Sequence, residues 1–107
     1  MSCADYNPAM REQVLLQPVE LARVAVVAAS EKQASDVVML DISAVSDFAD
    51  YFVILTAESS RQMETVSEEI RKQLKLTGGM LHHREGSPHS GWILLDFGEL
   101  VVHLFAP

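Results

Sequence analysis

Two short segments of the chain are apolar at almost every position. They are DVVMLDI at residues 36–42 and DYFVILT at residues 50–56, and both contain several β-branched side chains. Continuous apolar character over so few residues is typical of central strands that are covered on both faces of a sheet. The stretch SAVSDFA between them predicts a loop or a single turn.

Two longer segments carry apolar residues at helical spacing. The first spans residues 18–33 and begins with Pro18, whose fixed φ and missing N–H suit the first turn of a helix. Its apolar band is wide, so we expect other elements to cover most of its circumference. The band consists of Leu21, Val24, Ala25, Val26, Val27, Ala28 and Ala29.

The second helix is predicted from Ser59 or Ser60, either of which can cap its N-terminus, to about Thr77. A Gly-Gly pair follows and ends the helix. On its surface, Glu68 and Lys72 have the i,i+4 spacing of a helical ion pair. Its apolar stripe is formed by Met63, Val66, Ile70 and Leu74.

The last part of the chain predicts three more strands. Residues 80–83 form a weak strand and residues 84–90 a polar loop, whereas GWILLD and ELVVHLF form a hairpin whose turn is centred on Phe97 and Gly98. The order is α-β-β-α-β-β-β. A strand, a long helix and a strand imply a right-handed crossover between parallel strands, and the hairpin adds an antiparallel piece. We therefore expect an α/β fold with a mixed sheet flanked by helices.

Length and composition fit one such domain. A chain of 107 residues, 49% of them hydrophobic, has room for a single core. We assign residues 18–107 to the domain and residues 1–17 to a mobile extension, because the latter lack the pattern of a signal or transit peptide. No apolar stretch approaches the ~20 residues that cross a bilayer, so no membrane anchor is expected. The single cysteine, Cys3, allows no internal disulfide and fits a reducing cytosol.

The charge balance restricts the class of partner. Eight Lys and Arg against 15 Asp and Glu give a formal net charge of −7. Direct binding of nucleic acid is disfavoured, because a protein that grips phosphates needs clustered cations. A basic protein is the more suitable partner for such a chain.

No motif predicts catalysis or metal binding. His82, His83 and His89 lack a ligand spacing such as HExxH, and neighbouring histidines in a strand point to opposite faces. Aspartates at strand ends usually form turns, and no D-x-D pair for Mg²⁺ occurs among Asp41, Asp47, Asp50 and Asp96. We therefore expect no catalytic residue, no metal and no cofactor.

Trp92 is the only tryptophan and lies at the start of a predicted strand, directly after a polar loop. Large aromatic side chains mostly pack inward, but tryptophan is also enriched at the centres of binding interfaces. The sequence is compatible with both positions.

Over about residues 21–107, three blocks of the sequence resemble the RsfS/Iojap family of ribosomal silencing factors. The blocks are DVVMLDIS at residues 36–43, DYFVILTAESSRQ at residues 50–62 and GWILLDFGELVVHLF at residues 91–105. The second is similar to the family signature D-Y-F-V-I-…-S-S-R-Q, and the third to W-…-L-D-[FY]-G-…-V-V-H-…-F. All three occur in the order and at the spacing of the family.

The resemblance implies a fold similar to that of nucleotidyltransferases, without their catalytic carboxylates. It also implies a translation regulator of the bacterial cytosol that binds ribosomal protein L-fourteen on the large subunit, blocks joining of the small subunit and silences translation when nutrients are short. A homodimer is expected because family members self-associate and strand 100–105 is apolar enough to leave an edge or a face uncovered. A nucleotidyltransferase-like enzyme and an interaction module with a non-ribosomal partner are the alternatives.

The matched motifs also imply the site residues. Trp92 is similar to the family's exposed sheet tryptophan and is the first choice for an anchor in the partner interface. The candidate partner-binding residues are Trp92, Asp50, Tyr51, Arg61, Asp96 and His103. Structural roles are expected for Gly98 in the turn, Ser60 as a cap and Asp96 in the hairpin. Family members usually continue beyond the H-x-F segment into a C-terminal tail, whereas this sequence stops at Pro107. We therefore predict no partner contact or dimer contact that depends on the tail.

Overall fold

The predicted order of elements is present in residues 17–107, the part of the chain that the computed structural model describes. The elements are α2 (Pro18–Glu31), β1 (Ser35–Asp41), β2 (Tyr51–Thr56), α3 (Ser60–Leu76), β3 (His83–Ser87), the short 3₁₀ helix η2 (Pro88–Ser90), β4 (Trp92–Asp96) and β5 (Leu100–Phe105). The predicted extension, residues 1–17, lies outside the described residues except for Gln17, whose carbonyl accepts hydrogen bonds from the first turn of α2.

The strands form a five-stranded mixed sheet in the order β1-β2-β5-β4-β3. β2 and β5 are parallel, and all other neighbours are antiparallel. These pairings make β3 parallel to β2, as the predicted crossover requires, but two strands separate them. β5, the last strand along the chain, therefore lies in the centre of the sheet.

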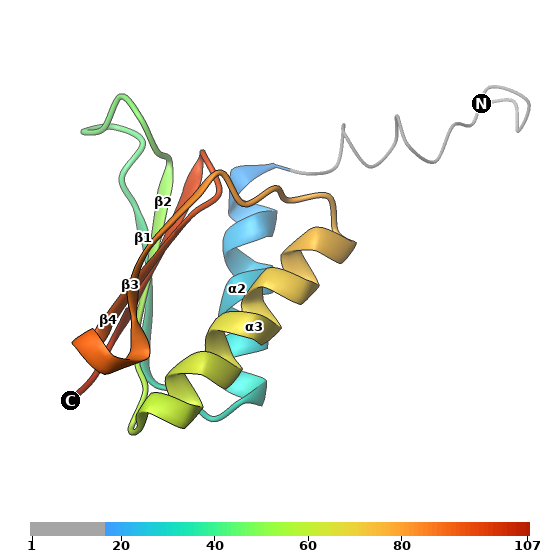
Figure 1. The fold of residues 1–107 in the computed structure, drawn as a ribbon. Coiled ribbons are helices and arrows are strands. Elements are labelled where there is room, and N and C mark those ends of the chain that lie inside the picture. The colour runs from blue at the N-terminus through green and yellow to red at the C-terminus, as the bar shows by residue number, and fades with distance from the viewer. Residues whose placement is uncertain (1–16) are drawn as a thin grey trace, which may run out of the picture.

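Both helices lie on the same side of the sheet (Figure 1). α3 buries the predicted stripe of Met63, Val66, Ile70 and Leu74, and α2 buries Leu21, Ala22, Ala25, Ala28 and Ala29. Alanine side chains occupy little volume, so α2 packs closely against both α3 and the sheet. The core of the domain is the layer between this helix pair and one face of the sheet.

Polar contacts fix the two helices to each other where α3 begins. Ser59 caps α3, because its hydroxyl oxygen accepts a hydrogen bond from the Gln62 N–H at 3.0 Å. The Gln62 amide group then donates to the carbonyl oxygens of Lys32 and Gln33, at 3.1 and 2.9 Å, just beyond the end of α2. One side chain thus satisfies carbonyl groups that the end of α2 leaves unpaired.

Two predictions about the strands are wrong. β1 and β2 are not covered on both faces, because both helices pack on one side, and the last four residues of β1 are exposed at the edge of the sheet. β3 begins at His83 and continues through residues 84–87, which were expected to form a loop. Its polar sequence does not prevent pairing, because an edge strand needs only one partner, here β4.

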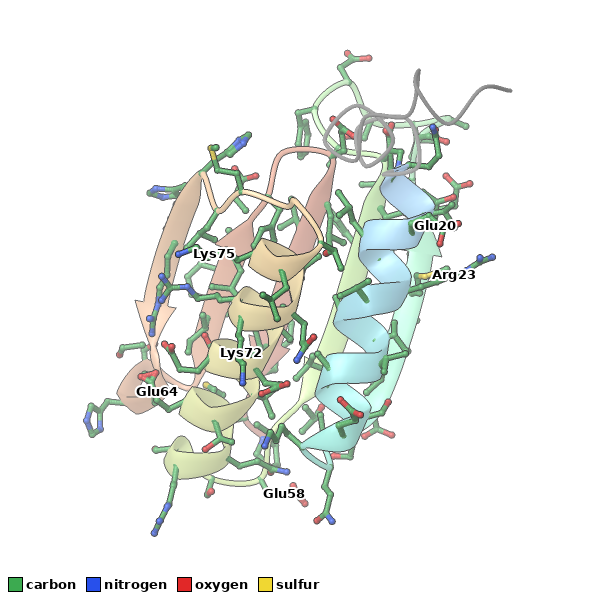
Figure 2. The ribbon with its side chains drawn as sticks, turned by 90° about the vertical axis from the view of Figure 1, so that its right-hand side faces the viewer. Glu20, Arg23, Glu58, Glu64, Lys72 and Lys75 are labelled. Atoms are coloured by element: carbon green, nitrogen blue, oxygen red, sulfur yellow. The ribbon has the colours of Figure 1, made fainter. Side chains whose placement is uncertain are left out.

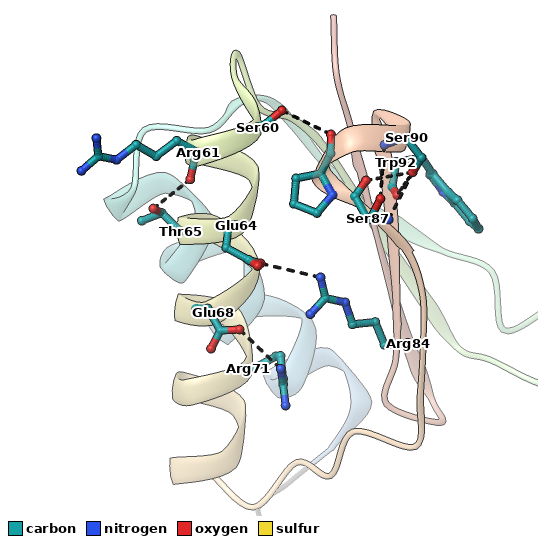
Figure 3. Close-up of polar contacts among 11 residues, drawn as sticks. Ser60, Arg61, Glu64, Thr65, Glu68, Arg71, Arg84, Ser87, Ser90 and Trp92 are labelled. Atoms are coloured by element: carbon teal, nitrogen blue, oxygen red, sulfur yellow. Dashed lines mark hydrogen bonds and ion pairs between the residues drawn. The ribbon is translucent and has the colours of Figure 1, made fainter.

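Three predictions about the helices also need correction. Val27 in α2 is 57% exposed, so the helix is less completely covered than its apolar band suggests. Glu68 forms its ion pair with Arg71, at 3.4 Å, and not with Lys72. Ser60 is not the cap of α3, since Ser59 fills that role and the Ser60 hydroxyl donates to the carbonyl of Pro88 (Figure 3).

Gly86 allows β3 to pass close to Trp92. Its φ is +81°, and a Cβ atom at this position would overlap the carbonyl oxygen of Trp92. Gly91 provides an internal comparison, because its φ of +79° is nearly the same but the nearest atom to a Cβ there is Ala106 Cβ, at 3.5 Å.

We expect Gly86→Ala to lower the free energy of unfolding by at least ~3 kcal/mol, because steric overlap adds to the strain of a left-handed backbone. Gly91→Ala should lower it by only ~1–2 kcal/mol, since strain acts there alone. Urea denaturation of both variants measures the difference. Equal losses would contradict the close approach at Gly86.

Candidate functional site

The sheet has a second face that no helix of residues 17–107 covers. Residues opposite each other in paired strands share a face, and residues alternate between faces along a strand. The pairs Leu40 with Phe52, Trp92 with Phe105 and Leu94 with His103 all belong to the uncovered side. We call the apolar part of this surface the open face; it consists of Val38, Leu40, Phe52, Ile54, Trp92, Leu94, His103 and Phe105. The same side of the sheet also carries Asp96, the buried Val101 and, on the edge strand β3, His83 and Glu85.

The open face is apolar and reaches solvent. Val38, Leu40 and Phe105 are 45%, 41% and 40% exposed, and the other members are half-buried against one another. The alternate residues of the same strands are fully buried beneath the helices: Val53, Leu55, Ile93, Leu95, Val102 and Leu104. A contiguous apolar surface of this kind on a single chain marks a site of interaction with another molecule.

Three rings form the middle of the open face. The Phe52 and His103 rings meet edge to face, with centroids 4.8 Å apart. His103 and Phe105 are nearly parallel, with centroids 6.2 Å apart. His103 therefore sits between two phenylalanines from neighbouring strands, and aromatic pairs of this geometry stabilise the arrangement of the rings.

His103 is the one titratable group among the eight residues of the open face. Burial lowers the pKa of its imidazole below the ordinary value, because the apolar surroundings disfavour the charged form. Its Nε2 atom is buried and has no hydrogen-bond partner among the described residues. A partner molecule that places a polar group here would satisfy this nitrogen.

Trp92 lies half-buried on the open face and not in the core beneath the helices. A small polar network holds the backbone beside it (Figure 3). Ser87 and Ser90 form a reciprocal cap around η2, with backbone-to-hydroxyl distances of 3.1 and 3.3 Å, and the Ser90 hydroxyl lies 3.1 Å from the Trp92 carbonyl. The indole ring is thus presented from a fixed backbone.

The structure brings some of the predicted site residues together and separates others. Asp96 lies on the same side of the sheet as Trp92 and His103, but at the opposite end of β4 from Trp92. Its carboxylate accepts a hydrogen bond from the Gly98 N–H at 2.8 Å, which supports the predicted role of Asp96 in the hairpin. Tyr51 packs against the core on the helix side. Asp50 joins the loop before β2 to the sheet through its backbone, and Arg61 is exposed in the first turn of α3.

Several residues of the open face were not predicted as site residues, among them Phe52, Ile54, Leu94 and Phe105. The signal that could have identified them is the continuous apolar character of 50–56, in which both alternate sets of residues are apolar. One of these two sets of side chains is required for the core, so the other set is available to contact a partner.

The carboxylates show structural uses. Hydrogen bonds from the hydroxyl and backbone N–H of Ser43, at 2.7 and 3.0 Å, lower the pKa of Asp41, which forms a turn at the end of β1 as expected. Among residues 17–107, no group of three His, Cys, Asp or Glu side chains is arranged to hold a metal ion. No helix in the same part of the chain is long and apolar enough to cross a membrane.

The lowered pKa of His103 predicts a dependence of stability on pH. Below the ordinary pKa of about 6.5, the unfolded chain binds a proton at His103 more readily than the folded protein does, so stability is lost as the pH falls toward the lower folded pKa. We expect wild type to lose more stability between about pH 7.5 and 5.5 than His103→Gln, which cannot titrate there. Chemical denaturation at the two pH values tests this, and parallel losses in both proteins would contradict burial of the ring.

Comparison with known proteins identifies the family. Residues 16–107 match the family described as "Ribosomal silencing factor during starvation" (RsfS). The chain is 34% identical over 85 residues to the ribosomal silencing factor RsfS of Bacillus subtilis (strain 168), an alignment that covers 79% of this chain and 72% of that protein. It is also 35% identical over 89 residues to the chloroplastic protein Iojap of Arabidopsis thaliana. This alignment covers 83% of this chain and 35% of the longer Iojap protein.

The fold agrees with this assignment. A crystal structure of a protein from Chromobacterium violaceum superposes with a TM-score of 0.82 at 26% sequence identity, covering 86% of this chain and 77% of the other. The similarity in sequence spans both the helical layer and all five strands. The chain belongs to the family of ribosomal silencing factors.

Proposed function

We propose that the open face binds ribosomal protein L-fourteen on the large ribosomal subunit and that the bound protein sterically blocks joining of the small subunit, which silences translation when nutrients are limiting. The protein would act in the bacterial cytosol through residues 18–107, without a catalytic step. The single observation that carries the proposal is the apolar face around Trp92, His103 and Phe105, left uncovered in a chain of this family.

The character of the open face suits a protein partner. Aromatic side chains at the centre of an interface supply most of the binding energy in many complexes. Here Phe52 and Phe105 flank the half-buried His103, and Trp92 lies opposite Phe105 in the neighbouring strand. We assign Trp92 and His103 to this contact, with Asp96 at its margin.

The charge of the chain supports the same class of partner. The net charge of −7 gives the chain a field that attracts a basic ribosomal protein and repels exposed RNA phosphates. Such a field accelerates and orients association, whereas the apolar open face holds the complex together. Inhibition then requires only that the bound domain occupy space that the small subunit needs.

Trp92→Ala tests the proposal. If Trp92 anchors the partner, the variant should lose ~2 kcal/mol of binding, about thirtyfold in affinity for large subunits, while its melting temperature stays near that of wild type. Sedimentation with purified large subunits measures binding, and light scattering of mixed subunits measures joining. Leu76→Ala is the matched control, because Leu76 is an apolar side chain, 70% exposed, at the end of α3 in the helical layer.

Wild-type protein that fails to sediment with large subunits, or leaves subunit joining unchanged in excess, would overturn the proposal. A large fall in the melting temperature of Trp92→Ala, with binding retained by the folded fraction, would assign Trp92 to packing. Capture of a non-ribosomal protein in a pull-down would support the interaction-module alternative. Mg²⁺-dependent nucleotide turnover lost on replacing Asp50 or Asp96 would support the enzyme alternative.

We also propose that the free protein forms a homodimer through the open face. β5 is not an edge strand, because it pairs with β2 on one side and β4 on the other, so an uncovered edge at this strand is excluded. Its outward side chains His103 and Phe105 belong instead to the open face, which a second copy can cover.

We expect light scattering at tens of micromolar protein to give the mass of a dimer. Phe105→Glu should shift the mass toward the monomer, because it places a charge where apolar surfaces would meet. Leu76→Glu adds the same charge on the helical layer and should leave the dimer intact. A monomeric wild type at this concentration would refute self-association.

A further inference from the structure

A pocket of about 550 Å³ lies on the helical side of the molecule, beside the C-terminal half of α3. One wall is the surface of α3, with Glu68, Arg71, Lys72 and Lys75. The facing wall is the segment that leads from α3 to β3, with Met80 and Leu81. Its volume lies within the range of sites that bind small organic ligands. The open face, by contrast, is on the side of the sheet that the helices do not cover.

The pocket follows from the way α3 ends. Gly78 has φ +98°, which reverses the chain, and its N–H donates to the carbonyl of Lys75 at 3.2 Å. Gly79 then passes so close to the last turn of α3 that a Cβ atom there would lie 3.2 Å from the carbonyl oxygen of Leu74. The chain therefore returns alongside α3 and carries Met80 and Leu81 opposite the cationic side chains of the helix.

The pocket concentrates positive charge in an acidic protein. Three of the eight Lys and Arg residues of the chain fall between Arg71 and Lys75, and all three line the pocket. Arg71 is engaged by Glu68 at 3.4 Å. Neither Lys72 nor Lys75 forms an ion pair with a carboxylate of residues 17–107, although acidic residues outnumber basic ones in this part of the chain. Figure 2 shows both lysines on α3.

Stabilisation of the helix end explains the position of only one of these two lysines. Lys75 lies in the last turn of α3, where a cation interacts favourably with the helix dipole. Lys72 lies almost a turn earlier and lacks the partner, Glu68, that its i,i+4 spacing offers. The facing Met80 is 71% exposed, and the buried Phe97 contributes to the pocket lining, so free ammonium groups and apolar surface occur in one concave site.

We propose that this pocket binds a small organic anion that carries a phosphate-type group and an apolar body. The anionic group is held by the ammonium groups of Lys72 and Lys75, and the apolar body lies against Met80, Leu81 and Phe97. Nucleotides and acyl phosphates are cellular compounds of this class. Binding here is independent of the partner site proposed above, because the two surfaces share no residue.

Anilinonaphthalene sulfonate, an aromatic sulfonate, is the probe for the test, observed through the backbone amide resonances of the ¹⁵N-labelled full chain. We expect the Gly78, Gly79 and Leu81 amides to shift on titration. Lys72→Gln combined with Lys75→Gln should weaken this binding about tenfold, since two exposed charge contacts are removed. Arg23→Gln combined with Arg61→Gln is the matched control, because it removes two exposed cations that do not line the pocket and should leave the affinity unchanged.

Two competition arms define the ligand class. Adenosine triphosphate should displace the probe from the pocket, whereas inorganic phosphate at the same concentration should not, because it lacks an apolar body. Met80→Gln should weaken the probe several-fold through the loss of apolar contact.

The proposal is overturned if the shifts are confined to open-face amides such as those of Ile54 and Leu94, or if both double variants weaken binding equally. Displacement by inorganic phosphate as effective as that by adenosine triphosphate would also overturn it. Sedimentation with large subunits reports separately on the partner site, so failure of one proposal is distinguishable from failure of the other.

Discussion

The structure depends on the packing of two helices against one face of a five-stranded sheet. The small side chains of α2 let it pack closely against α3 and the sheet, and the side chain of Gln62 ties the start of α3 to the end of α2. Because both helices occupy the same side, β2, β4 and β5 each have one set of side chains in the core and another set outside it. These three strands therefore contribute both to the stable interior and to the surface that is open to a partner.

The helices and the hairpin could be predicted because their signals are local. Pro18, the Ser59 cap and the glycines after α3 fix helix ends through contacts a few residues apart. The covering of β1 and β2 could not be predicted in this way. Apolar residues at every position predict that both faces of a strand are covered, but the sequence does not distinguish a helix of the same chain from a surface of another molecule as the cover. The third strand was predicted too early, at residues 80–83, because the residues HREGS of β3 have no apolar periodicity and the position of β3 depends on pairing with β4.

Only some residues of the candidate site could be predicted from the sequence, for a related reason. Trp92 and His103 were identified from motif resemblance, and the structure places both on the open face. Motifs also include residues that stabilise the fold, and Tyr51, which packs against the core, is one of them. Phe52 and Phe105 are apolar residues in apolar strands, so only the register of β2, β4 and β5 shows that they surround His103.

The central position of β5 has a consequence for how the domain acquires its structure during synthesis. β2 emerges from the ribosome well before its parallel neighbour, since Tyr51 pairs with Leu100 and Thr56 with Phe105. Until residue 105 has been made, β2 and β4 have no strand between them, and no subset of the earlier elements contains a complete sheet. Non-local parallel pairing of this kind forms slowly, because a long loop must close before any contact is gained. Folding is therefore completed only after translation of β5, and the nascent chain exposes apolar strands until then.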